Sequence, residues 1–172
     1  GVTDDSSITF SDASNNPNVT GATVDINVEK TPVQGAEQEL WGSGEGEGSY
    51  TFSNNASWSL LGVGGSGGIL ASDKELFKAG ATLKVAFTTT SDGYPLELFT
   101  NWDRDREFVE EYSYDEDSKY LIYKFVDSDF GGPGGTNDVT NAGLILAVIG
   151  DVTVTITKIS IKPAPTTENT ND

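Results

Sequence analysis

Aromatic side chains next to polar turns are the groups in this sequence most able to recognise a ligand. Tryptophan offers a large flat apolar face and one N–H donor, which suits stacking against the C–H face of a sugar ring. Amide and carboxylate side chains beside it can then hydrogen-bond the hydroxyls of the sugar. We therefore predict a ligand-binding set made of Trp41, Trp58, Trp102, Tyr94, Tyr112, Tyr114, Asn101, Glu97 and Gln38.

Each tryptophan has a competing interpretation as a core residue. Trp58 shares the phase of Leu60 in a segment of small residues, which favours the core. Trp102 is surrounded by polar and charged residues, which favours contact with a ligand. Trp41, beside a glycine-rich run, is intermediate between the two. We expect two of the three tryptophans to reach a ligand.

Carboxylates near a glycine-rich loop form the candidate metal site. Calcium prefers hard oxygen ligands from carboxylate, amide and carbonyl groups. No cofactor is expected to be required, and the candidate ion is a structural Ca²⁺ held by Asp127, Asp129, Asn137 and Asp138. A second acidic stretch, residues 103–117, lacks the EF-hand pattern and is more simply a solvated hairpin tip.

The composition argues against catalysis by the common nucleophilic and zinc mechanisms. The sequence contains no cysteine and no histidine, so Ser-His-Asp, Cys-His and thiolate chemistry are excluded. A glycosidase-like acid pair could join Glu97 to Glu107 or Glu110. However, the acidic residues concentrate in turns rather than in aromatic surroundings that would raise the pKa of one of them. We expect the chain not to be an enzyme.

The charge restricts the partners. A formal net charge of −17 sets up a negative potential that repels nucleic acid and anionic membranes, which bind through Lys and Arg. We expect neither as a partner. No run of about 18 apolar residues is present and no signal peptide opens the chain, so we expect a soluble protein whose export signal, if it had one, has been removed.

Alternating apolar and polar residues predict the elements that position these groups. Several segments have period two, which places one face in a core and the other in water. They include residues 24–28, 50–52, 58–60, 83–87, 96–102 and 120–126. Short strands separated by glycine-rich turns predict an all-β fold with an antiparallel two-sheet β-sandwich. A single helical turn is expected from Ser72 or Asp73, which would cap it, to Phe77, with Gly80 ending it.

The last strand, residues 152–161, changes phase part-way along. Its apolar residues move from even positions, up to Ile156, to odd positions, from Ile159. A β-bulge near Thr157 and Lys158 would account for the change. We assign residues 1–162 to one module, and 163–172, rich in Pro and Thr, to the start of a linker.

Two segments carry a resemblance to a known superfamily. They are residues 76–87, which read LFKAGATLKVAF, and residues 143–146 with 152–161, which read GLIL and VTVTITKISI. In these segments the chain resembles bacterial β-jelly-roll carbohydrate-binding modules appended to plant-cell-wall glycoside hydrolases. The resemblance implies a jelly-roll sandwich with a ligand cleft on a concave sheet face, and it is compatible with a structural calcium. It also implies a secreted, extracellular location and a monomer within a multi-modular enzyme.

These observations lead to one hypothesis and one alternative. The hypothesis is a non-catalytic module that binds β-1,4-glucan chains, namely cellulose oligomers, mixed-linkage β-glucan or xyloglucan, in a cleft. It would target an attached glycoside hydrolase to plant cell walls. The alternative is a protein-interaction or adhesion β-sandwich domain of a secreted or surface protein, in which the tryptophans belong to the core.

Overall fold

The computed structural model describes residues 31–42, 49–65, 67–100, 111–114, 119–131 and 138–166, and for 111–114 the backbone alone. The chain divides into two compact units, Gly1–Lys30 and Thr31–Asp172, and every described residue belongs to the second. The alternation predicted for residues 24–28 therefore lies outside the described residues.

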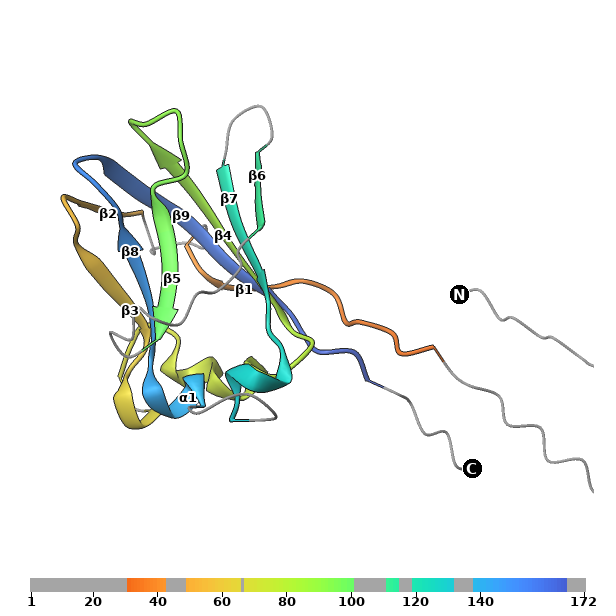
Figure 1. The fold of residues 1–172 in the computed structure, drawn as a ribbon. Coiled ribbons are helices and arrows are strands. Elements are labelled where there is room, and N and C mark those ends of the chain that lie inside the picture. The colour runs from red at the N-terminus through yellow and green to blue at the C-terminus, as the bar shows by residue number, and fades with distance from the viewer. Residues whose placement is uncertain are drawn as a thin grey trace, which may run out of the picture. The chain divides into compact units, whose positions relative to one another are not determined.

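The described part of this unit forms two antiparallel sheets (Figure 1). The larger has six strands in the order β1-β9-β4-β7-β6, with β2 also paired to β9, and the smaller has three in the order β3-β8-β5. The strands of the large sheet are β1 (Gln38–Trp41), β2 (Tyr50–Ser53), β4 (Thr82–Thr89), β6 (Glu111–Tyr114), β7 (Lys119–Lys124) and β9 (Thr153–Lys162). Those of the small sheet are β3 (Ser57–Leu61), β5 (Leu96–Thr100) and β8 (Leu144–Val148). The predicted all-β two-sheet sandwich is confirmed, and the jelly-roll topology within that class stays a prediction.

The core lies between the two sheets, where the alternation predicted it. Leu83, Val85 and Phe87 of β4 are fully buried, and so are Leu144 and Leu146 of β8 in the facing sheet. Each such side chain contributes about 1.5–3 kcal/mol when it leaves water. This apolar layer holds the two sheets together and sets the positions of the residues on their rims.

The outer face of the small sheet carries a second apolar cluster. Phe99 on β5 pairs with Ile145 on β8, and both side chains are only 7% exposed. Every residue of β8 is consequently buried. A strand that is buried on both faces reads as a continuous apolar run, as Leu144–Val148 does.

The predicted bulge is present in β9. Ala86 of β4 pairs with Lys158, whereas the next residue, Phe87, pairs with Ile156, so Thr157 is the extra residue. Its hydroxyl donates to the carbonyl of Ala86 at 3.2 Å. Because the bulge shifts the phase by one residue, Ile156 and Ile159 can both face the core.

The prediction of a single capped helical turn needs correction. The segment forms a 3-10 helix, η2 (Ala71–Leu76), whose N-cap is Leu70 without a side-chain hydrogen bond. Ser72 does not cap it, because its hydroxyl bonds the carboxylate of Asp73 instead. Gly80 does have the predicted positive φ, +89°.

Among the described residues, helical turns also form at three other places. They are η1 (Val63–Gly65), η3 (Asp127–Asp129) and a one-turn α-helix, α1 (Val139–Ala142). Asp138, which the sequence analysis predicted as a metal ligand, is the N-cap residue of α1. Across the part of the chain that the structure describes, no helix has the length and apolarity needed to cross a membrane.

The first residues of the predicted linker contact the sandwich. The amide of Thr166 donates to the carbonyl of Val33 at 3.2 Å, and Ala164 packs against the core. Residues 167–172 lie outside the described residues. The boundary of the linker stays a prediction.

Candidate functional site

The two described tryptophans meet in one group of rings, here called the aromatic cluster: Trp41, Tyr50, Phe52 and Trp58. Trp41 ends β1 and Tyr50 begins β2, both in the large sheet, whereas Trp58 lies on β3 in the small sheet. The cluster therefore joins the two sheets along one side of the sandwich.

A tight turn brings the rings of β2 and β3 together. Asn54 and Asn55 both have positive φ, 58° and 62°, and the amide of Ala56 donates back to the carbonyl of Ser53 at 3.1 Å. Asparagine tolerates this left-handed conformation better than most residues. The chain passes through this turn from the large sheet to the small one, since β2 pairs with β9 and β3 pairs with β8.

The rings have defined geometry. Tyr50 and Trp58 stack with centroids 4.1 Å apart and planes 12° apart. Trp41 meets Trp58 edge to face, at 5.0 Å and 76°. Phe52 lies behind them, 5.4 Å from Tyr50. Such pairs are worth about 0.5–1.5 kcal/mol beyond the burial of their area, so the cluster is a rigid unit.

Burial of the cluster is graded from the core to the surface. Phe52 is 7% exposed and belongs to the core. Trp41, Tyr50 and Trp58 are half-buried and pack against it. One ring face of Trp58 is covered by Tyr50, so any ligand contacts the rim of the cluster rather than an isolated open indole.

Gln38 is the predicted polar residue closest along the chain to this cluster. It pairs with Ile161, and Trp41 pairs with Ile159, so both lie on the same face of β1. Gln38 is exposed. Its amide can donate and accept hydrogen bonds on the face of β1 that also carries Trp41, as the predicted role requires.

Two further predicted residues lie elsewhere. Glu97 is exposed on β5 and pairs with Ala147, which faces away from the core, whereas Trp58 pairs with the core residue Leu146. Glu97 and Trp58 therefore lie on opposite faces of the small sheet. Tyr94 is half-buried, and its ring centroid lies 5.1 Å from the ammonium of Lys119.

The remaining predicted ligand residues are only partly described. Tyr112 and Tyr114 belong to β6, at the opposite edge of the large sheet from β1 and Trp41. Their side chains, and Asn101 and Trp102 altogether, lie outside the described residues. The sequence prediction missed Tyr50, which was assigned only to a strand face with Phe52. As an aromatic residue beside a glycine-rich turn, it met the criterion used for the others.

The predicted metal ligands have hydrogen-bonding roles of their own. Asp129 is 2% exposed and accepts hydrogen bonds from the hydroxyl of Tyr123 at 2.9 Å and the amide of Val126 at 2.8 Å. Asp138 accepts two bonds from Thr140, 2.8 Å from the amide and 2.7 Å from the hydroxyl. Asp127 is exposed.

A backbone bridge joins Asp138 to Phe130, the residue after Asp129, so the two segments do lie side by side. Asn137 lies outside the described residues. Within the described ranges, no group of three or more His, Cys, Asp or Glu side chains could hold a metal ion. The calcium site stays a prediction.

Comparison of the chain with protein-family models, with curated proteins and with solved structures gives no match.

Proposed function

We propose that the chain is a non-catalytic β-sandwich module that binds a β-1,4-linked glucan or a related hemicellulose at the aromatic cluster. One observation supports this proposal above the others. Trp41 and Trp58, which come from different sheets, lie 5.0 Å apart and are both half-buried. A sugar-binding surface requires aromatic rings that are partly exposed, and both tryptophans meet this requirement.

The packing of the cluster suits a neutral ligand. Its rings are already held by one another and by Phe52, so binding immobilises few additional side chains. The half-buried rings of Trp41 and Tyr50 offer apolar contact, and the exposed Gln38 offers hydrogen bonds to hydroxyls. Because the ligand is neutral, affinity is expected to change little with salt concentration.

The wider biological role follows from the resemblance described above and is part of the proposal. The module would be extracellular and monomeric, and would target an attached glycoside hydrolase to plant cell walls by raising its local concentration at the substrate. It would require no cofactor.

The test is affinity electrophoresis against xyloglucan, barley β-glucan, hydroxyethylcellulose, glucomannan and xylan. Retardation by at least one of the β-1,4-linked polymers is expected, with loss of retardation in Trp41→Ala. Phe130→Ala is the matched control, since Phe130 is also a half-buried ring packed on the core but lies in a different segment. Trp102→Ala tests the predicted site that the structure does not describe.

The alternative is a protein-interaction or adhesion domain. The stacking of Tyr50 over one face of Trp58 favours it, because a covered ring face is typical of a core tryptophan. Tryptophan fluorescence separates the two functions. Glycan binding predicts a spectral change with soluble glucan, which disappears in Trp41→Ala. Unretarded migration in every gel together with an unchanged spectrum would move the assignment to protein interaction.

A further inference from the structure

The outer face of the large sheet carries an unusual concentration of positive charge. Lys84, Lys124, Lys158 and Lys162 are four of only ten basic residues in a chain of net charge −17. Their neighbours in sequence, among them Leu83, Val85 and Ile159, are fully buried on the other face. Because side chains alternate along a strand, all four lysines point away from the core.

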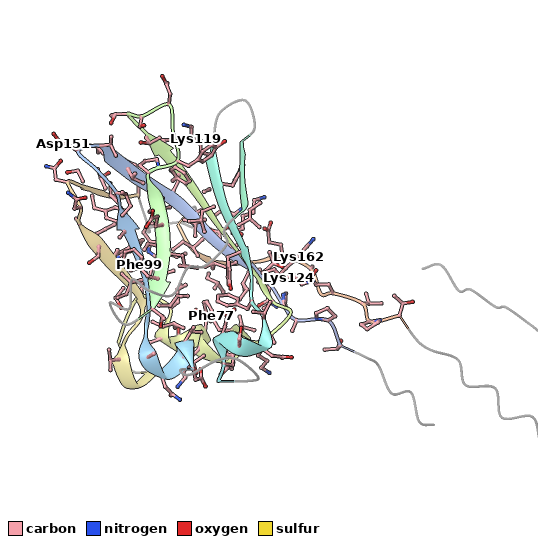
Figure 2. The ribbon with its side chains drawn as sticks, in the orientation of Figure 1. Phe77, Phe99, Lys119, Lys124, Asp151 and Lys162 are labelled. Atoms are coloured by element: carbon pink, nitrogen blue, oxygen red, sulfur yellow. The ribbon has the colours of Figure 1, made fainter. Side chains whose placement is uncertain are left out.

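The strand register places these lysines around Lys84. Lys158 pairs with Ala86, two residues after Lys84, and Lys124 pairs with Thr82, two residues before it. Lys162 also pairs with Thr82, from the other side. Figure 2 shows Lys124 and Lys162 close together at this end of the sheet.

Lys158, Lys84 and Lys124 form a diagonal row across β9, β4 and β7, here called the lysine row. Each step in it joins diagonal neighbours on adjacent strands, which are roughly 7–8 Å apart in an antiparallel sheet. The row therefore presents positive charges at a nearly regular interval, with Lys162 beside it.

Little in the described structure neutralises these charges. No ion pair or hydrogen bond of the ammonium groups of Lys124, Lys158 or Lys162 occurs among the described residues. The ammonium of Lys84 lies 4.4 Å from the ring centroid of Tyr120, a contact that orients the charge without cancelling it. Two glutamates lie on the β1 side of this face: Glu37 accepts a hydrogen bond from Ser160 at 3.0 Å, and Glu39 pairs with Ser160, which in turn pairs with Lys84.

We propose that the lysine row is a second binding surface, for a linear glycan that carries regularly repeated carboxylates, such as a polyuronate. Charge complementarity supports an acidic partner, because the row is a local positive area on a strongly negative molecule. A regular interval of charges suits a polymer with a regular repeat.

An acidic peptide fits this surface less well. Extended peptides usually bind a sheet by adding a strand to a free edge. The row instead crosses the interior of the sheet, since β4 is paired to β9 on one side and to β7 on the other. It offers side chains only: ammonium groups, the half-buried ring of Tyr120, and hydroxyls such as that of Thr82. The choice of a glycan among polyanions rests on the proposed function, whereas the position of the lysine row follows from the strand register alone.

The experiment is affinity electrophoresis of the intact chain in gels that contain polygalacturonate, with fully methyl-esterified polygalacturonate as the uncharged form of the same polymer. Retardation is expected only in the charged gel, and it should fall as salt is raised. Each lysine changed to Gln should weaken binding about two- to fivefold, and Lys84→Gln combined with Lys124→Gln and Lys158→Gln should abolish retardation.

Lys78→Gln is the matched control, because Lys78 is exposed and lies outside the sheets. It should bind like the unchanged protein. Circular dichroism checks that the triple variant folds, and its retention of neutral β-glucan binding would show that the aromatic cluster is intact. Failure of neutral binding with normal polygalacturonate binding would overturn the proposed function and leave this inference standing.

Three outcomes would overturn the inference. One is the absence of retardation by polygalacturonate. Another is equal retardation in the esterified gel, since carboxylates would then be irrelevant. The third is tighter binding to poly-glutamate than to polygalacturonate, which would assign the row to an acidic protein segment.

Discussion

Tyr50 stacks on Trp58 with nearly parallel rings, 4.1 Å between centroids and 12° between planes, although the two residues belong to different sheets. The contact depends on the turn at Asn54 and Asn55, which passes the chain from one sheet to the other. It fixes the orientation of both rings relative to each other.

The stacking should be measurable as a coupling energy. In a double-mutant cycle, the variant with both Tyr50→Ala and Trp58→Ala should lose less unfolding free energy than the sum of the losses in the two single variants. The difference should be about 0.5–1.5 kcal/mol. Urea unfolding measures each variant. As control, the losses of unfolding free energy in Tyr50→Ala and Phe77→Ala should be additive. Phe77 lies outside the aromatic cluster and packs its ring against Phe125, whereas Tyr50 packs against Phe52 and Trp58. Additivity of the Tyr50 and Trp58 changes would contradict the importance of the stack.

Gly42 should tolerate no side chain. Its φ is +120°, and a Cβ built there would lie 2.3 Å from the carbonyl oxygen of Thr157, at the β9 bulge. Gly42→Ala should therefore lower the free energy of unfolding by about 2 kcal/mol or more, since the clashing atom belongs to the backbone and cannot move away by a change of rotamer.

Gly64→Ala is the control for Gly42, because Gly64 also has positive φ, +74°, but no atom within 4 Å of the built Cβ. It should lose only about 1 kcal/mol, from backbone strain alone. Denaturant midpoints compare the two variants. Equal losses would mean that the close approach to Thr157 has no energetic consequence.

Lys119 ties the loop between β4 and β5 to β7. Its ammonium donates to the carbonyls of Ser91, Asp92 and Gly93 at 3.0, 2.8 and 2.7 Å. Lys119→Met keeps much of the side-chain volume but removes these bonds, and should lower the unfolding free energy by about 1–2 kcal/mol. Amide hydrogen exchange in residues 91–93 should become faster.

The control for this loop is Lys78→Met, which removes an equal charge at an exposed site. It should change stability by less than about 0.5 kcal/mol. Unchanged exchange in residues 91–93 of Lys119→Met would show that the loop is held by other contacts.

Asp129 should be a stability determinant whether or not it contacts a metal. Asp129→Asn removes the charge that strengthens the hydrogen bonds from Tyr123 and Val126, and should cost about 1.5–3 kcal/mol. Asp127→Asn, two residues away and exposed, should cost less than about 0.5 kcal/mol. Thermal unfolding in EDTA makes the comparison in the absence of divalent ions. Equal effects of the two changes would refute the structural role of Asp129.

Much of the fold could be predicted because it depends on patterns within single strands. The alternation at Leu83, Val85 and Phe87 requires one buried face, and the phase change between Ile156 and Ile159 requires an extra residue between them. Both are local consequences of side chains that alternate along a strand, and both are confirmed. Capping was predicted less well, because Asp138 could equally serve a helix or a metal.

The candidate site was predicted only in part, because sites combine residues from strands that are distant in the sequence. Of the residues selected by type, Trp41 and Trp58 meet in the aromatic cluster and Gln38 lies on the same face of β1 as Trp41, but the same criteria selected Glu97, which lies on the other face of the small sheet. No feature of residue type distinguishes these cases. Strand order and register do.

By itself, then, the sequence determined most of the strands, their buried faces, the bulge and the strongly negative charge, because each depends on neighbours along the chain or on composition alone. It did not predict β6, which lies in the stretch interpreted as a solvated hairpin tip. The tertiary structure decided that Tyr50 joins Trp58 and that Lys84 lies between Lys124 and Lys158. These groupings arise from the pairing of distant strands, and that pairing is set by the packing of the whole core rather than by any one segment.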